Sequence, residues 1–148
     1  MTTFFIAGII QGSVRGDTIH PQEYREHIRR ILARHVPDAD VYCPIEHHPD
    51  SLKYDDARAR EVFFDHLERA RTADVLVAFL PEASMGTAVE MWEAHRNNRI
   101  VLTVTDMTLN WSVKFLSTRV FPDLSAFERF VTDGGLAGLI RERAEQKA

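Results

Sequence analysis

Nearly uninterrupted apolar runs recur along the chain and are separated by stretches with a different periodicity. The clearest runs occupy residues 4–10, 73–80 and 99–105, with a shorter one at residues 40–43. Continuous apolarity over so few residues is typical of strands covered on both faces, as in parallel sheets. A further short edge strand is expected at residues 119–121.

Between these runs, apolar residues follow helical spacing. Tyr24, Ile28 and Ile31 form one such stripe, and Pro21 suits the first turn of the helix that carries them. The stripe expected further along the chain consists of Val62, Phe63, Leu67 and Ala70. Helices are predicted over residues 21–35, 54–72, 87–97, 109–116, 124–131 and 136–146, and a loop over residues 44–52.

Strands that alternate with helices indicate an α/β fold. We expect a single doubly wound parallel sheet of the flavodoxin or Rossmann-like kind, with about five strands and helices on both faces. The whole chain, residues 1–148, is expected to form one domain. Ligands of such sheets bind at the carboxyl ends of the strands, which here carry the loops of residues 8–16 and 81–86.

Composition narrows the classes of function. With 45% hydrophobic and 27% charged residues and a net charge of −4, the chain lacks the basic character of proteins that bind nucleic-acid polymers. No apolar run approaches the roughly 20 residues of a membrane span. The single cysteine, Cys43, favours a reducing compartment, so a cytoplasmic protein that binds a small molecule is expected.

Glu90 is the most conspicuous polar residue, because it stands among apolar residues near the start of a predicted helix. The helix dipole would keep a carboxylate ionised there. Ser84 and Gly86 add a hydroxyl and open backbone N–H groups at the same helix end, a combination that suits an anion. An ordinary surface carboxylate in a first helical turn remains the alternative.

Other candidate groups are weaker. The loop GIIQGSVRG contains Gly8, Gly12 and Gly16, which would permit close approach of a ligand, although it is neither a dinucleotide-binding nor a Walker loop. The neighbouring His47 and His48 have no partner at metal-ligand spacing, so no metal site is expected. No organic cofactor is expected either.

Three segments carry a resemblance to a known family. The opening FIAGIIQG, the stretch ADVLVAF ahead of SMGTAVEM, and RIVLTV are similar to the nucleoside 2-deoxyribosyltransferase-like superfamily. Within it the chain resembles the nucleoside 5′-monophosphate N-glycosidases as much as the transferases. The similarity runs over residues 4–130 and is specific over residues 73–104.

The resemblance implies roles for individual residues. Glu90 matches the glutamate that attacks the anomeric carbon of the sugar, and Asp65 is the best counterpart of the acid that assists the departing base. Ser84 and Gly86 match the residues that hold a 5′-phosphate. The remaining substrate-binding candidates are Ile10 and Gln11 near the base pocket, Gly12 and Ser13 near the phosphate, Asn110 and Ser117 from a neighbouring subunit, and Gly8, which is given no specific part of the substrate.

Shared active sites imply a homodimer or a higher homo-oligomer. The alternative for the segment of residues 110–117 is that Trp111, Phe115 and Leu116 pack in the core.

The chain departs from the family pattern at three positions. Asp65 lies nine residues before Asp74 rather than eight, and His66 takes the usual place. Trp92 stands where a glycine usually follows the nucleophile. Phe5 replaces a tyrosine of the first strand that orients the nucleophile.

The function expected is hydrolysis of the N-glycosidic bond of a nucleoside 5′-monophosphate or a related small nucleotide through a glutamyl-sugar intermediate. The alternatives are a base-exchanging 2-deoxyribosyltransferase, a non-catalytic nucleotide-binding module on the same fold, and an interaction protein that binds no nucleotide.

Overall fold

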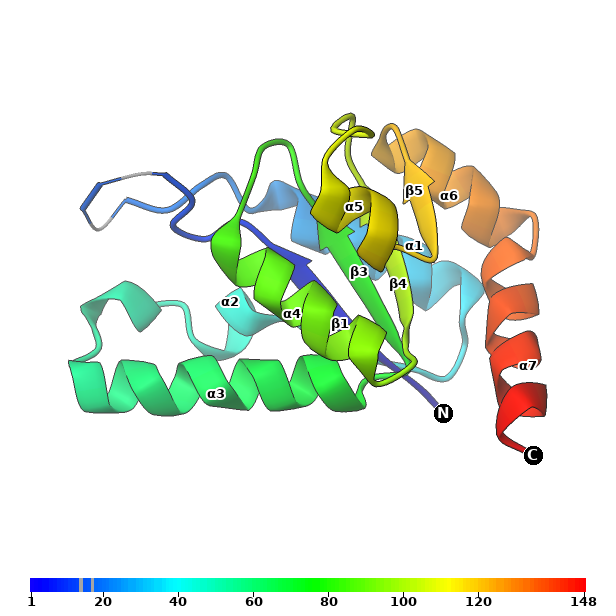
Figure 1. Ribbon diagram of the computed structural model, residues 1–148, viewed down its shortest axis with the longest axis horizontal. Helices are drawn as coiled ribbons and strands as arrows, with labels where there is room; N and C mark the ends of the chain where they lie inside the picture. Colours follow the sequence, from blue (N-terminus) through cyan, green and yellow to red (C-terminus); the bar gives the residue numbers. More distant parts are fainter. Residues whose placement is uncertain (14, 17) are drawn as a thin grey trace.

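A five-stranded, fully parallel sheet forms the centre of the protein in the computed structural model, which describes residues 1–13, 15, 16 and 18–148 (Figure 1). The strands are β1 (Thr2–Gly8), β2 (Ala39–Tyr42), β3 (Val75–Phe79), β4 (Ile100–Val104) and β5 (Arg119–Phe121). Their order across the sheet is β2-β1-β3-β4-β5, and every neighbouring pair is parallel. The expected doubly wound α/β fold is thereby confirmed.

Helices cover both faces of the sheet. One face packs against α1 (Glu23–His35), α6 (Leu124–Thr132) and α7 (Gly135–Lys147), and the other against α3 (Asp56–Thr72), α4 (Met85–Arg96) and α5 (Trp111–Leu116). In Figure 1, α4 lies in front of the sheet and α1 behind it. Within the described part of the chain, no helix has the length and apolarity needed to cross a membrane.

The segment expected to be a loop, residues 44–52, contains two short helical turns. They are α2 (Pro44–His47) and the 3-10 turn η1 (Ser51–Lys53). Proline is favoured at the first position of a helix, where Pro44 stands, because its missing N–H would have no partner there. Turns of three or four residues are too short to produce a recognisable periodicity, which is why the sequence pattern missed them.

Side chains of the three central strands, β1, β3 and β4, alternate between two apolar layers. Phe4 and Ile6 of β1 pack with α1, α6 and α7, whereas Phe5 and Ala7 pack with α3 and α4. Both layers are buried, so both sets of strand positions are apolar. This double burial accounts for the uninterrupted apolar runs in the sequence.

The inward stripe of α3 differs from the expected one. Val62 and Ala70 are buried, but Phe63 is 46% exposed. His66 stands midway between Val62 and Ala70 at helical spacing, and its imidazole packs edgewise near Phe5. A search for apolar residues alone passes over a histidine, and it therefore placed Phe63 on the wrong face.

The amino ends of β1 and β3 are joined through side chains. Asp74 Oδ2 accepts hydrogen bonds from the backbone N–H and the hydroxyl of Thr3, at 3.0 and 2.9 Å. The backbone N–H of Asp74 donates in return to Thr3 Oγ1. These bonds fix the two central strands at the end opposite the loops that are expected to bind a ligand.

Candidate functional site

The carboxyl ends of β1 and β3 mark the switch point of the sheet. Gly8 and Phe79 are paired there, and the chain leaves β1 toward α1 on one face and β3 toward α4 on the other. Ligands of open α/β sheets bind in the crevice that such a divergence creates. His20 Nε2 lies 2.6 Å from Glu82 Oε1, a contact that joins the loop after β1 to the loop after β3.

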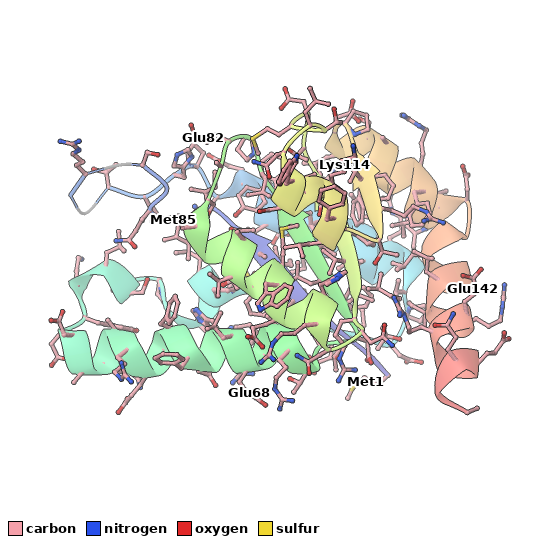
Figure 2. The ribbon with its side chains drawn as sticks, in the orientation of Figure 1. Met1, Glu68, Glu82, Met85, Lys114 and Glu142 are labelled. Atoms are coloured by element: carbon pink, nitrogen blue, oxygen red, sulfur yellow. The ribbon has the colours of Figure 1, made fainter. Side chains whose placement is uncertain are left out.

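The start of α4 is built as an open helix end. Ser84 is its N-cap and accepts a hydrogen bond from Thr87 N at 3.3 Å, so the helix begins two residues earlier than expected. Gly86 is exposed, and a Cβ added there would meet no atom within 4 Å. Figure 2 shows Met85 and Glu82 at this end of the molecule. Open N–H groups at the start of a helix favour an anion.

A cavity of about 450 Å³ joins several of the predicted substrate-binding residues. Gly12 and Ser13 line it from the loop after β1, Ser84 from the N-cap of α4, and Asn110 from the segment before α5. Asn110 belongs to the same chain as the other three, and its Oδ1 caps α5 by accepting from the backbone of Ser112 and Val113.

Gly12 is required by the shape of this loop. Its φ is +57°, and a Cβ would lie 2.7 Å from Ile9 Cγ2. We expected Gly12 to permit close approach of a ligand. It is also the residue type that this backbone conformation, with its positive φ, favours.

The other loop candidates, Ile10 and Gln11, line a second cavity of about 610 Å³. Its remaining walls come from η1 and α3 and are largely apolar or aromatic. They include Leu52, Tyr54, Val62, Phe63, Phe64 and His66. A cavity of this size and lining can accept a planar heteroaromatic ring.

Glu90 is partly buried in the second turn of α4, and no described residue donates a hydrogen bond to its carboxyl group. Burial raises the pKa of this carboxyl to about 8, and the nearby Arg25 guanidinium opposes the rise. The expectation that the helix dipole keeps Glu90 ionised is therefore wrong at neutral pH. The earlier start of α4 moves Glu90 beyond the first turn, where the dipole acts most strongly, and desolvation outweighs it.

Arg25 is a buried cation that the sequence analysis did not identify. Only 3% of the residue is exposed. Its guanidinium donates to the carbonyl oxygens of Ile6 and Gly8, at 2.9 and 3.3 Å, and to Gln22 Oε1 at 2.6 Å. The sequence did contain a signal for the burial of Arg25, because this residue stands three positions before Ile28 in the inward stripe of α1.

Asp65 and His66 differ in their surroundings although they are neighbours on α3. The Asp65 side chain is 46% exposed and accepts a hydrogen bond of 2.7 Å from Arg69. The His66 imidazole is turned inward among Phe5, Tyr42 and His48, and its Nε2 is buried without a partner among the described residues. Burial, together with His48, lowers the pKa of His66 to about 4.

The other positions of interest are dispersed. Phe5 is fully buried and stacks on Tyr42. Trp92 is 50% exposed and packs beside His95, so it does not belong to the core. Ser117 shares a hydrogen bond of 2.7 Å with Thr103 at the end of α5.

The described residues contain no group of three or more His, Cys, Asp or Glu side chains that could hold a metal ion.

An apolar surface runs along α4 and α5. Met85, Val89 and Trp92 follow one another at helical spacing on α4, and all three are exposed. On α5, Trp111 is 78% exposed and Phe115 is 60% exposed. The alternative in which these two aromatic residues pack in the core is therefore wrong.

Comparisons with known proteins find the fold but no sequence family. Neither a family model nor a curated protein matches the sequence. A conserved protein from Enterococcus faecalis V583 is 19% identical with a TM-score of 0.64, and the match covers 90% of this chain and 98% of that one. A 2-deoxyribosyltransferase from the psychrotolerant bacterium Bacillus psychrosaccharolyticus is 17% identical with a TM-score of 0.63, covering 86% and 90%. The chain thus has the fold of a nucleoside 2-deoxyribosyltransferase.

Proposed function

We propose that the protein hydrolyses the N-glycosidic bond of a nucleoside 5′-monophosphate or a related small nucleotide. The observation that carries the proposal is the Glu90 carboxyl group, which has no hydrogen-bond donor among the described residues and lies on α4 at the switch point of the sheet. The carboxyl group is partly buried and desolvation raises its pKa, and carboxyl groups with raised pKa values concentrate at functional sites.

The start of α4 supports a phosphate on the substrate. Ser84 and the N–H of Gly86 provide donors at a helix N-terminus, and Gly12 and Ser13 face the same cavity as Ser84. A phosphate bound there would place the sugar within the turn of α4 that carries Glu90. The base would then extend toward the aromatic cavity beside Ile10 and Gln11.

The reaction follows the logic of retaining glycosidases. The ionised Glu90 carboxylate attacks the anomeric carbon while the bond from that carbon to the base nitrogen breaks, and the bonding electron pair leaves with the base. An acid protonates the base as it departs. Water then attacks the anomeric carbon of the glutamyl ester, which releases the sugar phosphate and regenerates Glu90.

We assign the acid to α3, with Asp65 as the residue that the family resemblance implies. Its carboxylate contacts Arg69, an exposed partner on the next turn. His66 is the neighbouring residue that faces inward, and it is the alternative candidate for the acid. Substitutions of Asp65 and His66 distinguish the two. Neither a metal ion nor an organic cofactor is part of the proposal.

We further propose that the active form is a homodimer. The exposed aromatic residues of α4 and α5 flank the cavity that contains Ser84 and Asn110, since Met85 belongs both to that apolar surface and to the cavity wall. Neighbouring exposed apolar and aromatic side chains are typical of interaction sites on proteins.

Base exchange is the second candidate function. It is favoured by the shared fold with the 2-deoxyribosyltransferase. The first chemical step is the same in both reactions, and the two differ only in whether water or a second base attacks the glutamyl ester.

The test is base release from a panel of ribo- and deoxyribonucleoside 5′-monophosphates, each incubated with and without a second free base. Glu90→Gln is the matched variant, because it keeps the shape of the side chain and removes its nucleophilicity. Free base produced by the wild type and lost in Glu90→Gln supports hydrolysis, and a new nucleotide formed only with added base supports exchange. Thermal stabilisation by a nucleotide without any release would contradict both and identify a binding module.

A further inference from the structure

The two loops that flank the cavity at the start of α4 are joined by one imidazole. His20 belongs to the loop after β1, and its Nε2 lies 2.6 Å from Oε1 of Glu82 on the loop that leads from β3 into α4 (Figure 2). At this distance an N–H at Nε2 donates to the carboxylate. Ser84, the N-cap of α4, follows Glu82 by two residues. The contact therefore connects the two walls of the cavity, which carry Gly12 and Ser13 on one side and Ser84 on the other.

The position of His20 is fixed by the hydrogen bonds of its backbone. Its N–H donates to the carbonyl oxygen of Ile10 at 2.9 Å, and its own carbonyl oxygen accepts from Gln22 Nε2 at 2.6 Å. Gln22 Nε2 also donates to the carbonyl oxygen of Ile9 at 2.9 Å, while Gln22 Oε1 accepts from the buried Arg25. The end of the loop is thus tied to its beginning, which gives the His20 side chain a defined place.

The His20 ring also lies against the glycine of its own loop. A Cβ added to Gly12 would be 3.2 Å from His20 Cδ2 and 3.3 Å from His20 Nε2. Only 20% of the His20 side chain is exposed. The same ring therefore supports the Gly12 backbone on one side and reaches Glu82 on the other.

His20 and Glu82 can act on a bound phosphate without touching it. They line a different cavity, of about 450 Å³, together with the stacked rings of Tyr24 and Phe79, whose centroids are 4.4 Å apart. The Glu82 side chain is 55% exposed, and a charged contact at such a site contributes little to the stability of a fold. The contact is therefore better suited to setting the separation of two loops than to holding the fold together.

We propose that His20 is a positioning residue that holds the two walls of the phosphate cavity at a fixed separation by donating a hydrogen bond to Glu82. The proposal rests on the proposed function, in which these walls bind the 5′-phosphate. Walls that are already ordered bind phosphate more tightly than walls that must first be brought together. The gain cannot exceed the free energy of the contact, which for one hydrogen bond corresponds to about three- to tenfold in affinity.

Glu82→Ala is the decisive variant, since it removes the acceptor and leaves the His20 ring beside Gly12. We expect KM for nucleoside 5′-monophosphates to rise about three- to tenfold, with kcat and the KM for nucleosides unchanged. Removal of a negative charge near an anion would by itself lower KM, so the direction of the change separates positioning from charge. Glu82→Gln keeps an acceptor for the imidazole N–H, and its KM should equal the wild-type value or fall below it.

Glu23→Ala is the matched control. Glu23 is an exposed glutamate that lines the same cavity as Glu82, but His20 Nε2 is directed at Glu82. This variant removes the same charge and should not raise KM. The urea midpoint of Glu82→Ala should stay close to that of the wild type, because the side chain is largely exposed. An equal rise of KM in Glu82→Ala and Glu23→Ala would contradict the positioning role.

Binding of inorganic phosphate tests the proposal without catalysis. Isothermal titration calorimetry should give a dissociation constant about three- to tenfold higher for Glu82→Ala than for the wild type. Adding Glu82→Ala to His20→Ala should weaken binding no further, because the donor is already absent. Weaker phosphate binding in Glu82→Ala supports the positioning role even if the wild type releases no base, so failure of the proposed function is separable. Equal dissociation constants for the wild type and Glu82→Ala, or a wild type that binds no phosphate, would overturn the proposal.

Discussion

Arg69 Nε donates a hydrogen bond of 2.7 Å to the Asp65 carboxylate one turn earlier on α3. Both side chains are close to half exposed, so the ion pair should contribute no more than about 1 kcal/mol to stability. If Asp65 protonates the departing base, Asp65→Asn should lower kcat by about 10²- to 10⁴-fold with little change in the urea midpoint.

Arg69→Gln is the control for Asp65→Asn. It breaks the same ion pair and leaves the carboxyl group in place, so base release should persist. Full activity in Asp65→Asn, together with loss in His66→Gln, would transfer the role to His66, the residue that faces inward.

Base release should increase with pH. Nucleophilic attack needs the ionised Glu90 carboxylate, and the Glu90 pKa is about 8. We expect kcat/KM to rise about tenfold per pH unit below pH 8 and to level off above it. The measurement is a pH profile with one nucleotide. A profile that is already flat at pH 6 would show that Glu90 is ionised in the free enzyme.

The same group links stability to pH. The folded pKa of Glu90 is raised above the ordinary value of 4.5, so the folded protein keeps a proton that the unfolded chain releases. The resulting stability is fully present below pH 4.5 and is lost as pH rises toward 8, by at most about 1.4 kcal/mol per pH unit. Glu90→Gln should remove this dependence and unfold at a higher urea concentration than the wild type at pH 8. Parallel stability curves for the two proteins from pH 5 to pH 8 would contradict the prediction.

Gly86→Ala separates phosphate binding from helix stability. The added methyl group enters open space, and alanine favours the helix by about 0.5–1 kcal/mol, so the fold should tolerate it. We expect KM to rise for nucleoside 5′-monophosphates but not for nucleosides. Gly138→Ala in α7, where a Cβ also meets nothing, should stabilise the helix without changing KM. An equal rise of KM for nucleosides would show that Gly86 does not contact the phosphate.

Trp111→Glu tests the proposed dimer. A charge on a side chain that is 78% exposed should leave the fold intact but prevent an apolar surface from pairing. Analytical ultracentrifugation should give a dimer for the wild type and a monomer for the variant. Gln146→Glu adds the same charge on α7 and should remain dimeric. A monomeric wild type would remove the basis for a shared active site.

Much of the fold follows from local sequence pattern. The long apolar runs located β1, β3 and β4, because the centre of a parallel sheet buries both faces of each strand, and the two edge strands were located from shorter segments. The start of α4 was misplaced although Ser84, a strong N-cap residue, stood at the correct position. The earlier start moved Glu90 from the first turn into the second.

The environment of the candidate site was less accessible to sequence analysis. The pKa of Glu90 depends on burial and on Arg25, which lies 65 positions away along the chain and close only in the folded protein. Tyr24 was assigned to the core stripe of α1, and its ring does pack there. Periodicity in the sequence predicts which face of a helix carries a side chain, but it does not predict the position of the atom at the end of that side chain.

The stacking of Tyr24 on Phe79, with ring centroids 4.4 Å apart, also bears on how this protein can be recombined. A chimera that took the segment from β1 to α1 from one homologue and the segment from β3 to α4 from another could form every strand pair of the sheet. It would still combine a Tyr24 and a Phe79 that had not been selected together. Crossovers for making hybrids are therefore better placed after β4, where both rings come from one parent.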